Sequence, residues 1–121
     1  MGDILSLYLE AVSQDSSDLR KFIFGHPIVI FRKSEDIQVG LLKFEKDQVS
    51  KDLRFLFVFP NEKERIFHTI GMKFSIDIYF FDKDGTLVSK HLDCHPGIKE
   101  IKSNGLTKYV VETLADEEKK T

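Results

Sequence analysis

Residues 75–92 read SIDIYFFDKDGTLVSKHL, the clearest strand-turn-strand pattern in this chain. β-branched and aromatic residues fill the first part of the segment, as is typical of a strand. Residues 82–85 (DKDG) supply turn formers, and Gly85 can adopt the left-handed backbone that tight hairpin turns need. We therefore predict that residues 75–82 and 86–92 form a β-hairpin, and this hairpin decides the fold class.

Further strands are predicted on both sides of the hairpin. Residues 53–59 (LRFLFVF) are nearly all apolar and stop at Pro60, which predicts a strand covered on both faces. Four other segments that are rich in β-branched and aromatic residues are also predicted to be strands or extended segments. These segments are residues 19–24, 28–31, 65–69 and 106–113. Residues 93–105 are predicted to form a loop.

Two helices complete the prediction. Asp3 precedes apolar residues spaced as on one face of a helix up to Val12, and Ser34 is a good N-cap for a short helix over residues 34–43. The sequence thus predicts an α+β fold: a β-rich, compact single domain with a mixed sheet or a partly closed barrel. We expect residues 1–20 to be a helical extension and residues 116–121 to be a charged tail.

The composition is that of a globular protein of one domain. The chain has 121 residues, of which 41% are hydrophobic and 31% charged, and eleven phenylalanines and three tyrosines predict an aromatic core. A net charge of -2 gives no attraction to nucleic acid. No apolar stretch approaches the ~20 residues of a membrane span, and the N-terminus has no signal-peptide pattern. We expect a soluble, cytoplasmic protein without nucleic-acid or membrane partners.

The metal-ligating residue types do not form a known motif. His91, Cys94 and His95 make an H-x-x-C-H sequence, and His68 would have to join them from another segment. Zinc accepts such donors, but the spacing matches no common zinc motif. Cys94 is the only cysteine, so no disulfide can form within the chain. We favour ordinary loop residues here, and we predict no metal and no cofactor.

Asp77 is an acid within an aromatic strand. It shares one face with Tyr79 and Phe81, because alternate residues of a strand point to the same side. A three-residue hairpin loop would place Asp77 opposite His91, and a two-residue loop would place it opposite Lys90. A pair that fixes the strand register is favoured over a functional acid, which would need Asp77 to face a cleft.

A long stretch of the chain resembles a known family. Residues 56–60 and 68–85, with His68-Thr69, Met72-Lys73-Phe74 and the hairpin, are similar to the central motif of domain-of-unknown-function family 192, an uncharacterised group of bacteria and archaea. Residues 40–42 and 109–112 extend the likeness to residues 27–114. Gly71 and Ser75 depart from the family pattern, and its last turn is reduced here to 114–115. The resemblance implies a compact, mostly β fold with a flanking helix and no established activity.

The positions that match the family motif define the candidate site. A loop with an imidazole, a hydroxyl, a thioether and an ammonium group beside a strand carboxylate could bind a small polar ligand. These candidate ligand-binding residues are His68, Thr69, Met72, Lys73, Asp77 and His91. An equally weighted alternative is that Met72 fills the core while Thr69 and Asp77 satisfy backbone donors.

We therefore predict a non-catalytic module that binds a small ligand or a protein partner. The alternative is a hydrolase, with or without a metal, that uses Asp77 or His91 as a base. A third hypothesis is an interaction protein whose first helix docks on a partner through its apolar face.

Overall fold

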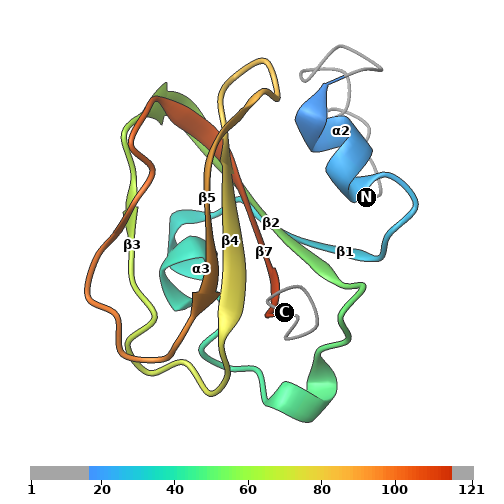
Figure 1. Ribbon diagram of the computed structural model, residues 1–121, viewed down its shortest axis with the longest axis vertical. Coiled ribbons are helices and arrows are strands. Elements are labelled where there is room, and N and C mark those ends of the chain that lie inside the picture. Colours follow the sequence, from blue (N-terminus) through green and yellow to red (C-terminus); the bar gives the residue numbers. More distant parts are fainter. Residues whose placement is uncertain (1–16, 116–121) are drawn as a thin grey trace.

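The computed structural model describes residues 17–115, which form one β-rich domain (Figure 1). Its main sheet has the strand order β1-β2-β7-β4-β5. The strands are β1 (Ile28–Phe31), β2 (Arg54–Lys63), β7 (Thr107–Leu114), β4 (Ile76–Phe81) and β5 (Leu87–Cys94). β1 and β2 are parallel and the other pairs are antiparallel. The predicted mixed sheet is confirmed, and within the described residues it does not close into a barrel.

A second, two-stranded sheet pairs β3 (Ile66–Phe67) with β6 (Ile101–Lys102), at the left of Figure 1. The extended segment predicted near residues 65–69 is thus confirmed. The prediction of a loop throughout residues 93–105 is wrong at β6. Two residues are too short a run to give a strand pattern in a sequence, and their pairing depends on β3 lying beside them.

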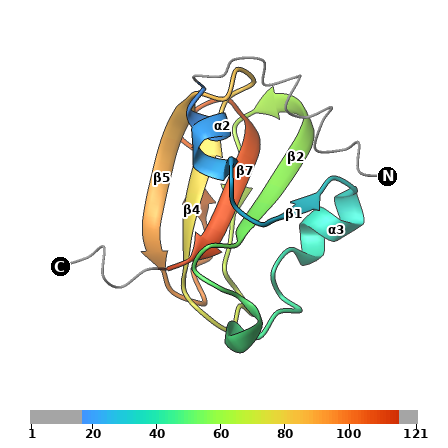
Figure 2. The ribbon, with the colours of Figure 1, turned by 90° about the vertical axis from the view of Figure 1, so that its right-hand side faces the viewer.

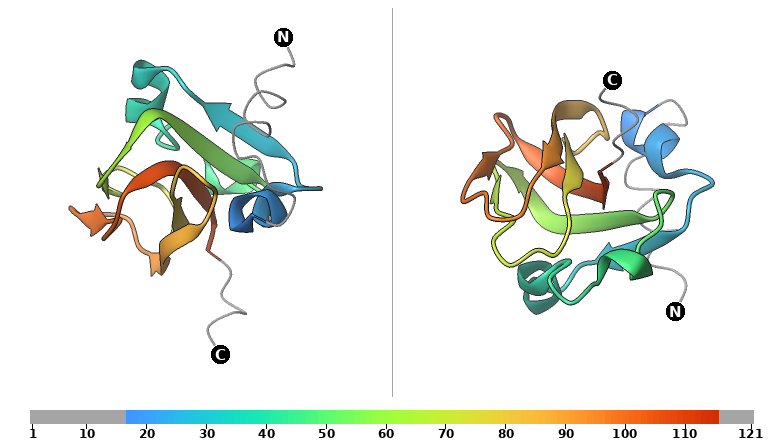
Figure 3. Two further views of the ribbon diagram at one scale, coloured as in Figure 1. Left: turned by 90° about the horizontal axis from the view of Figure 1, so that it is seen from above. Right: turned by 60° about the horizontal axis from the view of Figure 1, so that its bottom comes forward.

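Two short α-helices, α2 (Asp18–Ile23) and α3 (Ser34–Val39), pack on different sides of the main sheet (Figures 2 and 3). We call these sides the α2 face and the α3 face. A 3-10 turn, η1 (Lys46–Gln48), lies in the segment between α3 and β2. The helix predicted over residues 34–43 is confirmed, but it ends at Val39 and its N-cap is Lys33 rather than Ser34. The helix predicted over residues 4–12 and the charged tail lie outside the described residues, as does most of the predicted extension over residues 1–20.

The strand predicted over residues 19–24 is wrong, because this segment is the helix α2. The Ser17 side chain accepts a hydrogen bond from the backbone N–H of Arg20 at 3.1 Å and so caps the helix. Leu19 and Ile23, four residues apart, are both buried on one face. The cap and this spacing outweigh the β-forming character of the residues between them.

The hairpin is confirmed, but neither predicted register is correct. The loop has three residues, since Asp82 N–H donates to the Thr86 carbonyl at 2.9 Å. An irregularity between Phe80 and Phe81 shifts the pairing by one residue, so that His91 stands opposite Ile78, and a second irregularity follows between Ile76 and Ile78. Two residues of β5 lie across from Asp77, one more than a regular ladder allows.

The core divides between the two faces of the sheet. Ile76, Ile78 and Phe80 of β4 join a large aromatic cluster on the α3 face, together with Phe55 and Phe57. Tyr79 and Phe81 join a smaller cluster on the α2 face, which also contains Leu19 and Ile23. This alternation is the one expected of a strand buried on both sides. In residues 17–115, no helix is long and apolar enough to cross a membrane.

Candidate functional site

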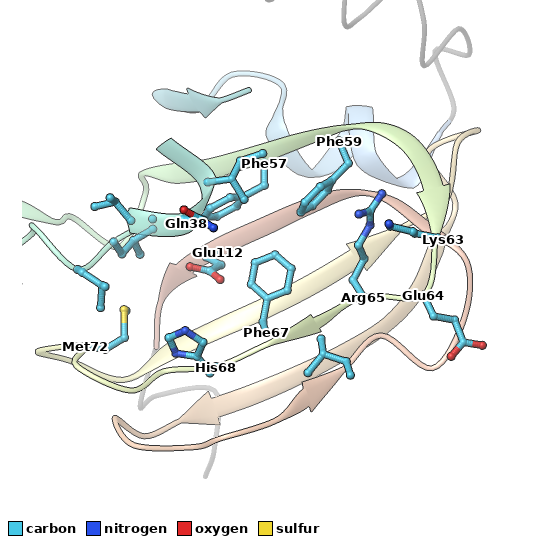
Figure 4. A pocket seen from close by; sticks show the side chains of 16 residues that line it. Gln38, Phe57, Phe59, Lys63, Glu64, Arg65, Phe67, His68, Met72 and Glu112 are labelled. Carbon is cyan, nitrogen blue, oxygen red and sulfur yellow. The ribbon is translucent and has the colours of Figure 1, made fainter. Parts of the chain in front are cut away.

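A cavity of about 680 Å³ opens on the α3 face (Figure 4). Its walls come from α3 and the turn after it, from β2, and from the segment that carries β3. The residues that line it are Ile37, Gln38, Val39, Gly40, Leu41, Leu42, Phe57, Phe59, Lys63, Glu64, Arg65, Ile66, Phe67, His68, Met72 and Glu112. This volume lies within the range of small-molecule sites, on the order of 300–1,000 Å³.

The wall beside the sheet is shaped by the end of α3. Gly40 follows the helix with a φ of 51°, and its backbone N–H donates to the Asp36 carbonyl at 2.8 Å. This left-handed conformation is easily adopted by glycine and ends the helix. The chain then turns inward, so that Leu41 is buried in the core while its neighbours line the cavity.

Aromatic rings form much of the remaining wall. The Phe67 ring meets Phe57 edge to face at 5.6 Å and Phe80 at 5.8 Å, measured between ring centroids. At the rim, the Arg65 guanidinium lies 3.9 Å from the centre of the Phe59 ring. Arg65 also donates to the Asn61 side chain at 3.0 Å and to the Thr107 carbonyl at 3.3 Å. These contacts hold the turn between β2 and β3 at the mouth of the cavity.

Glu112 on β7 is the buried acid of the cavity, whereas Glu64 is exposed at its edge. Its cross-strand partners are Phe55 and Ile78, which place it on the α3 face, and its carboxyl group is directed into the cavity (Figure 4). The residue is only 5% exposed, and burial raises its pKa to about 8. Among residues 17–115 its side chain has no hydrogen-bond or ion-pair partner.

Two of the six predicted ligand-binding residues, His68 and Met72, line the cavity. His68 is exposed, and its Nδ1 accepts a hydrogen bond from the Ile70 backbone N–H at 3.1 Å. Met72 is half-buried against the large core cluster. The neighbouring Thr69 is fully buried, where its hydroxyl donates to the His95 carbonyl at 2.6 Å and accepts from the Ile98 N–H at 2.9 Å.

The other three predicted residues are not among those lining the cavity. Lys73 is exposed and pairs with Glu45 at 3.0 Å. Asp77 is 1% exposed on the α2 face, and its Oδ1 accepts from the Asp93 N–H at 2.8 Å. His91 Nε2 donates to the Lys102 carbonyl at 2.8 Å, and its ring lies edge to face with Phe80. Thr69 and Asp77 thus accept hydrogen bonds from backbone N–H groups, as the alternative interpretation predicted. Ligand binding by any of the six residues stays a prediction.

The weak metal candidates do not form a cluster. Within residues 17–115, no three His, Cys, Asp or Glu side chains gather closely enough to hold a metal ion. Cys94 is buried, and burial together with the nearby carboxylates of Asp77, Glu112 and Asp93 raises its pKa to about 11. His95 is exposed, and its Nδ1 lies 3.1 Å from the Ser75 hydroxyl.

Glu112 was missed by the sequence analysis, which used residues 106–113 only as a strand. A signal was present: Glu112 shares a strand face with Val110 and Leu114, so it breaks an apolar row. An acid on a buried face is rare unless it has a partner or a function. Its position in a cavity depends on α3 and on residues 63–72, which no pattern in residues 106–113 reveals.

Comparisons with known proteins give a family and a fold. The model of the family DUF192, described as "Uncharacterized ACR", matches residues 25–121. A crystal structure from Sinorhizobium meliloti 1021, of a protein named as a proposed transcription regulator, has a TM-score of 0.70 and 21% identity. The match covers 77% of this chain and 71% of that one.

A second crystal structure, of a protein of unknown function from Novosphingobium aromaticivorans DSM 12444, has a TM-score of 0.69 and 16% identity. It covers 77% of this chain and 66% of that chain. No curated protein matches this sequence. Identities this low show a shared fold alone, so the regulator's name describes that protein only.

Proposed function

The chain belongs to the DUF192 family, and from this premise we propose that it is a non-catalytic module that binds a small molecule in the Glu112 cavity. The observation that carries the proposal is the Glu112 carboxyl group. It is 5% exposed and directed into the cavity, and it has no polar partner among residues 17–115.

An unpartnered buried carboxyl group is costly for the folded protein. Burying a polar group without a hydrogen bond costs roughly 1–3 kcal/mol by mutational data, and an ionised group costs more. Most buried polar groups in proteins therefore have a partner. A bound molecule that donates a hydrogen bond to Glu112 would remove this cost, so the buried carboxyl group favours binding of such a molecule.

The remaining lining fits a small, mostly apolar ligand. Phe57 and Phe67 offer ring surfaces, while Gln38 and His68 supply polar groups near the solvent side. Apolar walls with a few polar groups are typical of small-molecule sites.

The hydrolase alternative has less support. Asp77 lies on the α2 face and His91 on the α3 face, so the sheet separates the two proposed catalytic groups. Each side chain is also engaged with a backbone group. The third hypothesis depends on a first helix within residues that the structure does not describe.

Fragment screening by two-dimensional ¹⁵N–¹H NMR tests the proposal. We expect fragments that bind to shift the amide signals of residues 37–42, 65–68 and 112. Replacing the exposed Gln38 by Trp should fill the cavity mouth and weaken these fragments at least tenfold. Glu35→Trp makes a similar change at an exposed position of α3 outside the cavity lining and should leave binding unchanged.

Two results would refute the proposal. In one, a diverse fragment library contains no binder. In the other, binders shift only signals remote from the cavity and are equally affected by the two tryptophan variants.

A further inference from the structure

We propose that the ligand of the Glu112 cavity is an organic cation, a protonated amine carried on an apolar or aromatic body, whose ammonium group pairs with the Glu112 carboxylate. This inference rests on the proposed binding function and adds the chemical class of the molecule bound.

The first support is the lack of a protein cation at Glu112. In residues 17–115, no Lys, Arg or His side chain forms an ion pair with it. The lysine and the arginine of the lining, Lys63 and Arg65, lie toward the other end of the cavity in Figure 4, and His68 forms no ion pair with Glu112. Arg65 is moreover held there by Asn61, Thr107 and the Phe59 ring. The positive charge that would favour the ionised form of Glu112 is thus left for a ligand to supply.

The second support is the aromatic wall around the acid. Phe57 and Phe67 line the same cavity as Glu112, and an ammonium ion gains electrostatic stabilisation over aromatic faces. The rim already contains such a contact between Arg65 and Phe59 at 3.9 Å. An anionic ligand would meet both the ring faces and Glu112 unfavourably, while a neutral alcohol would gain only one hydrogen bond.

The protonation state of Glu112 makes the inference measurable. Its pKa of about 8 leaves the carboxyl group of the empty protein mostly protonated at pH 7. An ammonium group stabilises the ionised form, so binding transfers the Glu112 proton to the buffer and becomes tighter as the pH rises toward 8.

Other titratable groups lie around Glu112. Lys63, Glu64, Arg65 and His68 share its cavity, while His91 and Cys94 belong to β5 on the far side of β4. Cys94, with its pKa of about 11, stays neutral in this pH range. A His68→Gln variant removes the one imidazole of the cavity lining. If the affinity for the amine still rises with pH in this variant, the rise is not due to His68.

Isothermal titration calorimetry with three matched probes tests the inference. The probes are 2-phenylethylamine, the neutral 2-phenylethanol and the anionic 3-phenylpropanoate, which share a phenyl ring on a short chain. We expect the amine to bind at least tenfold more tightly than either of the others at pH 8. In buffers of different ionisation enthalpy at pH 7, amine binding should release close to one proton, on the order of the protonated fraction of Glu112.

The matched variants are Glu112→Gln and Glu64→Gln. Both remove a carboxylate from the cavity lining, but Glu64 is exposed at its edge. Glu112→Gln should abolish the preference for the amine and the proton release, whereas Glu64→Gln should keep both. The comparison of the three probes on the wild-type protein remains decisive even if Glu112→Gln does not fold.

The outcomes separate this inference from the proposed function. If the alcohol or the carboxylate binds the wild-type cavity as tightly as the amine, the cation inference is refuted and the binding function stands. The inference is also refuted if none of the three probes binds while other fragments do. If no probe and no fragment binds, both proposals fail.

Discussion

Two buried acids on neighbouring strands, Asp77 of β4 and Glu112 of β7, differ in what surrounds them. They occupy adjacent rows of one ladder, since Asp77 pairs with Thr113 and Ile78 pairs with Glu112, and so they point to opposite faces. Both are nearly inaccessible, at 1% and 5% exposure. The Asp77 carboxylate accepts the Asp93 N–H at 2.8 Å, whereas the Glu112 carboxyl group has no partner among residues 17–115. Burial alone therefore does not mark a functional acid, and a missing partner is the better indicator.

The hydrogen bond of Asp77 also has a clear structural purpose. Two residues of β5 stand opposite Asp77, and Asp93 has a φ of 57°. A non-glycine residue in this region is strained, and Asp93 lies in the irregular part of the ladder. The Asp77 carboxylate accepts the Asp93 N–H and so stabilises the bulge. Among residues 17–115, Glu112 makes no comparable hydrogen bond.

The largest expected effect comes from the pH dependence of stability in the Glu112→Gln variant. The folded protein has a raised pKa at Glu112, about 8 against an ordinary 4.5, so its stabilising contribution is complete below 4.5 and is lost as the pH rises through 8. Each unit of this difference corresponds to about 1.4 kcal/mol, which predicts a loss of several kcal/mol in the wild type.

Urea unfolding at pH 5, 7 and 9 measures this prediction. The free energy of unfolding of Glu112→Gln should fall less between pH 5 and pH 9 than that of the wild type, so that the variant becomes the more stable protein at pH 9. Glu64→Gln should follow the wild-type curve. Parallel curves for all three proteins would show that Glu112 ionises freely in the folded state.

A smaller effect, of opposite sign, is expected at Asp77. Asp77→Ala leaves the Asp93 N–H buried without its acceptor and should lower the free energy of unfolding by about 2–3 kcal/mol. Asp77→Asn keeps an acceptor oxygen and should cost less than half as much. Both values can be taken from urea unfolding at pH 7. Equal losses in the two variants would mean that charge, and not the hydrogen bond, is what the fold needs from Asp77.

The smallest effect is expected at Lys73, a residue that the family motif indicated for ligand binding. Its ion pair with Glu45 is exposed on both sides, so Lys73→Ala should change the free energy of unfolding by about 0.5 kcal/mol or less. Fragments bound in the Glu112 cavity should keep their affinity in this variant. A loss of fragment binding would move the candidate site from the cavity toward the loop at Lys73.

Local patterns in the sequence predicted much of the fold. Residues 75–92 gave the correct hairpin, with a three-residue loop as one of two possibilities. The apolar run before Pro60 gave the first part of β2, which continues past Pro60 to Lys63. Register was not predictable, because the irregularity between Phe80 and Phe81 displaces His91 by one position. At residues 19–24, β-forming residues predicted a strand, and the Ser17 cap that starts a helix there was not recognised. In each case the deciding interaction comes from a neighbour that the local pattern does not contain.

The site was less accessible to sequence reasoning than the fold. His68 and Met72 were identified through the family motif and do line the cavity. Glu112 contacts the same space from a strand more than forty residues later in the chain. Its importance depends on having no partner, and partners are a property of the folded protein. The sequence alone shows only that Glu112 interrupts an apolar strand face.

The most direct test of the central claim is a ¹³C NMR titration of the Glu112 side-chain carboxyl group, without and with saturating 2-phenylethylamine. We predict a midpoint near pH 8 in the free protein and a clear downward displacement when the amine is bound. A midpoint near 4.5 in the free protein, or one near 8 that saturating amine leaves unmoved, would contradict the account.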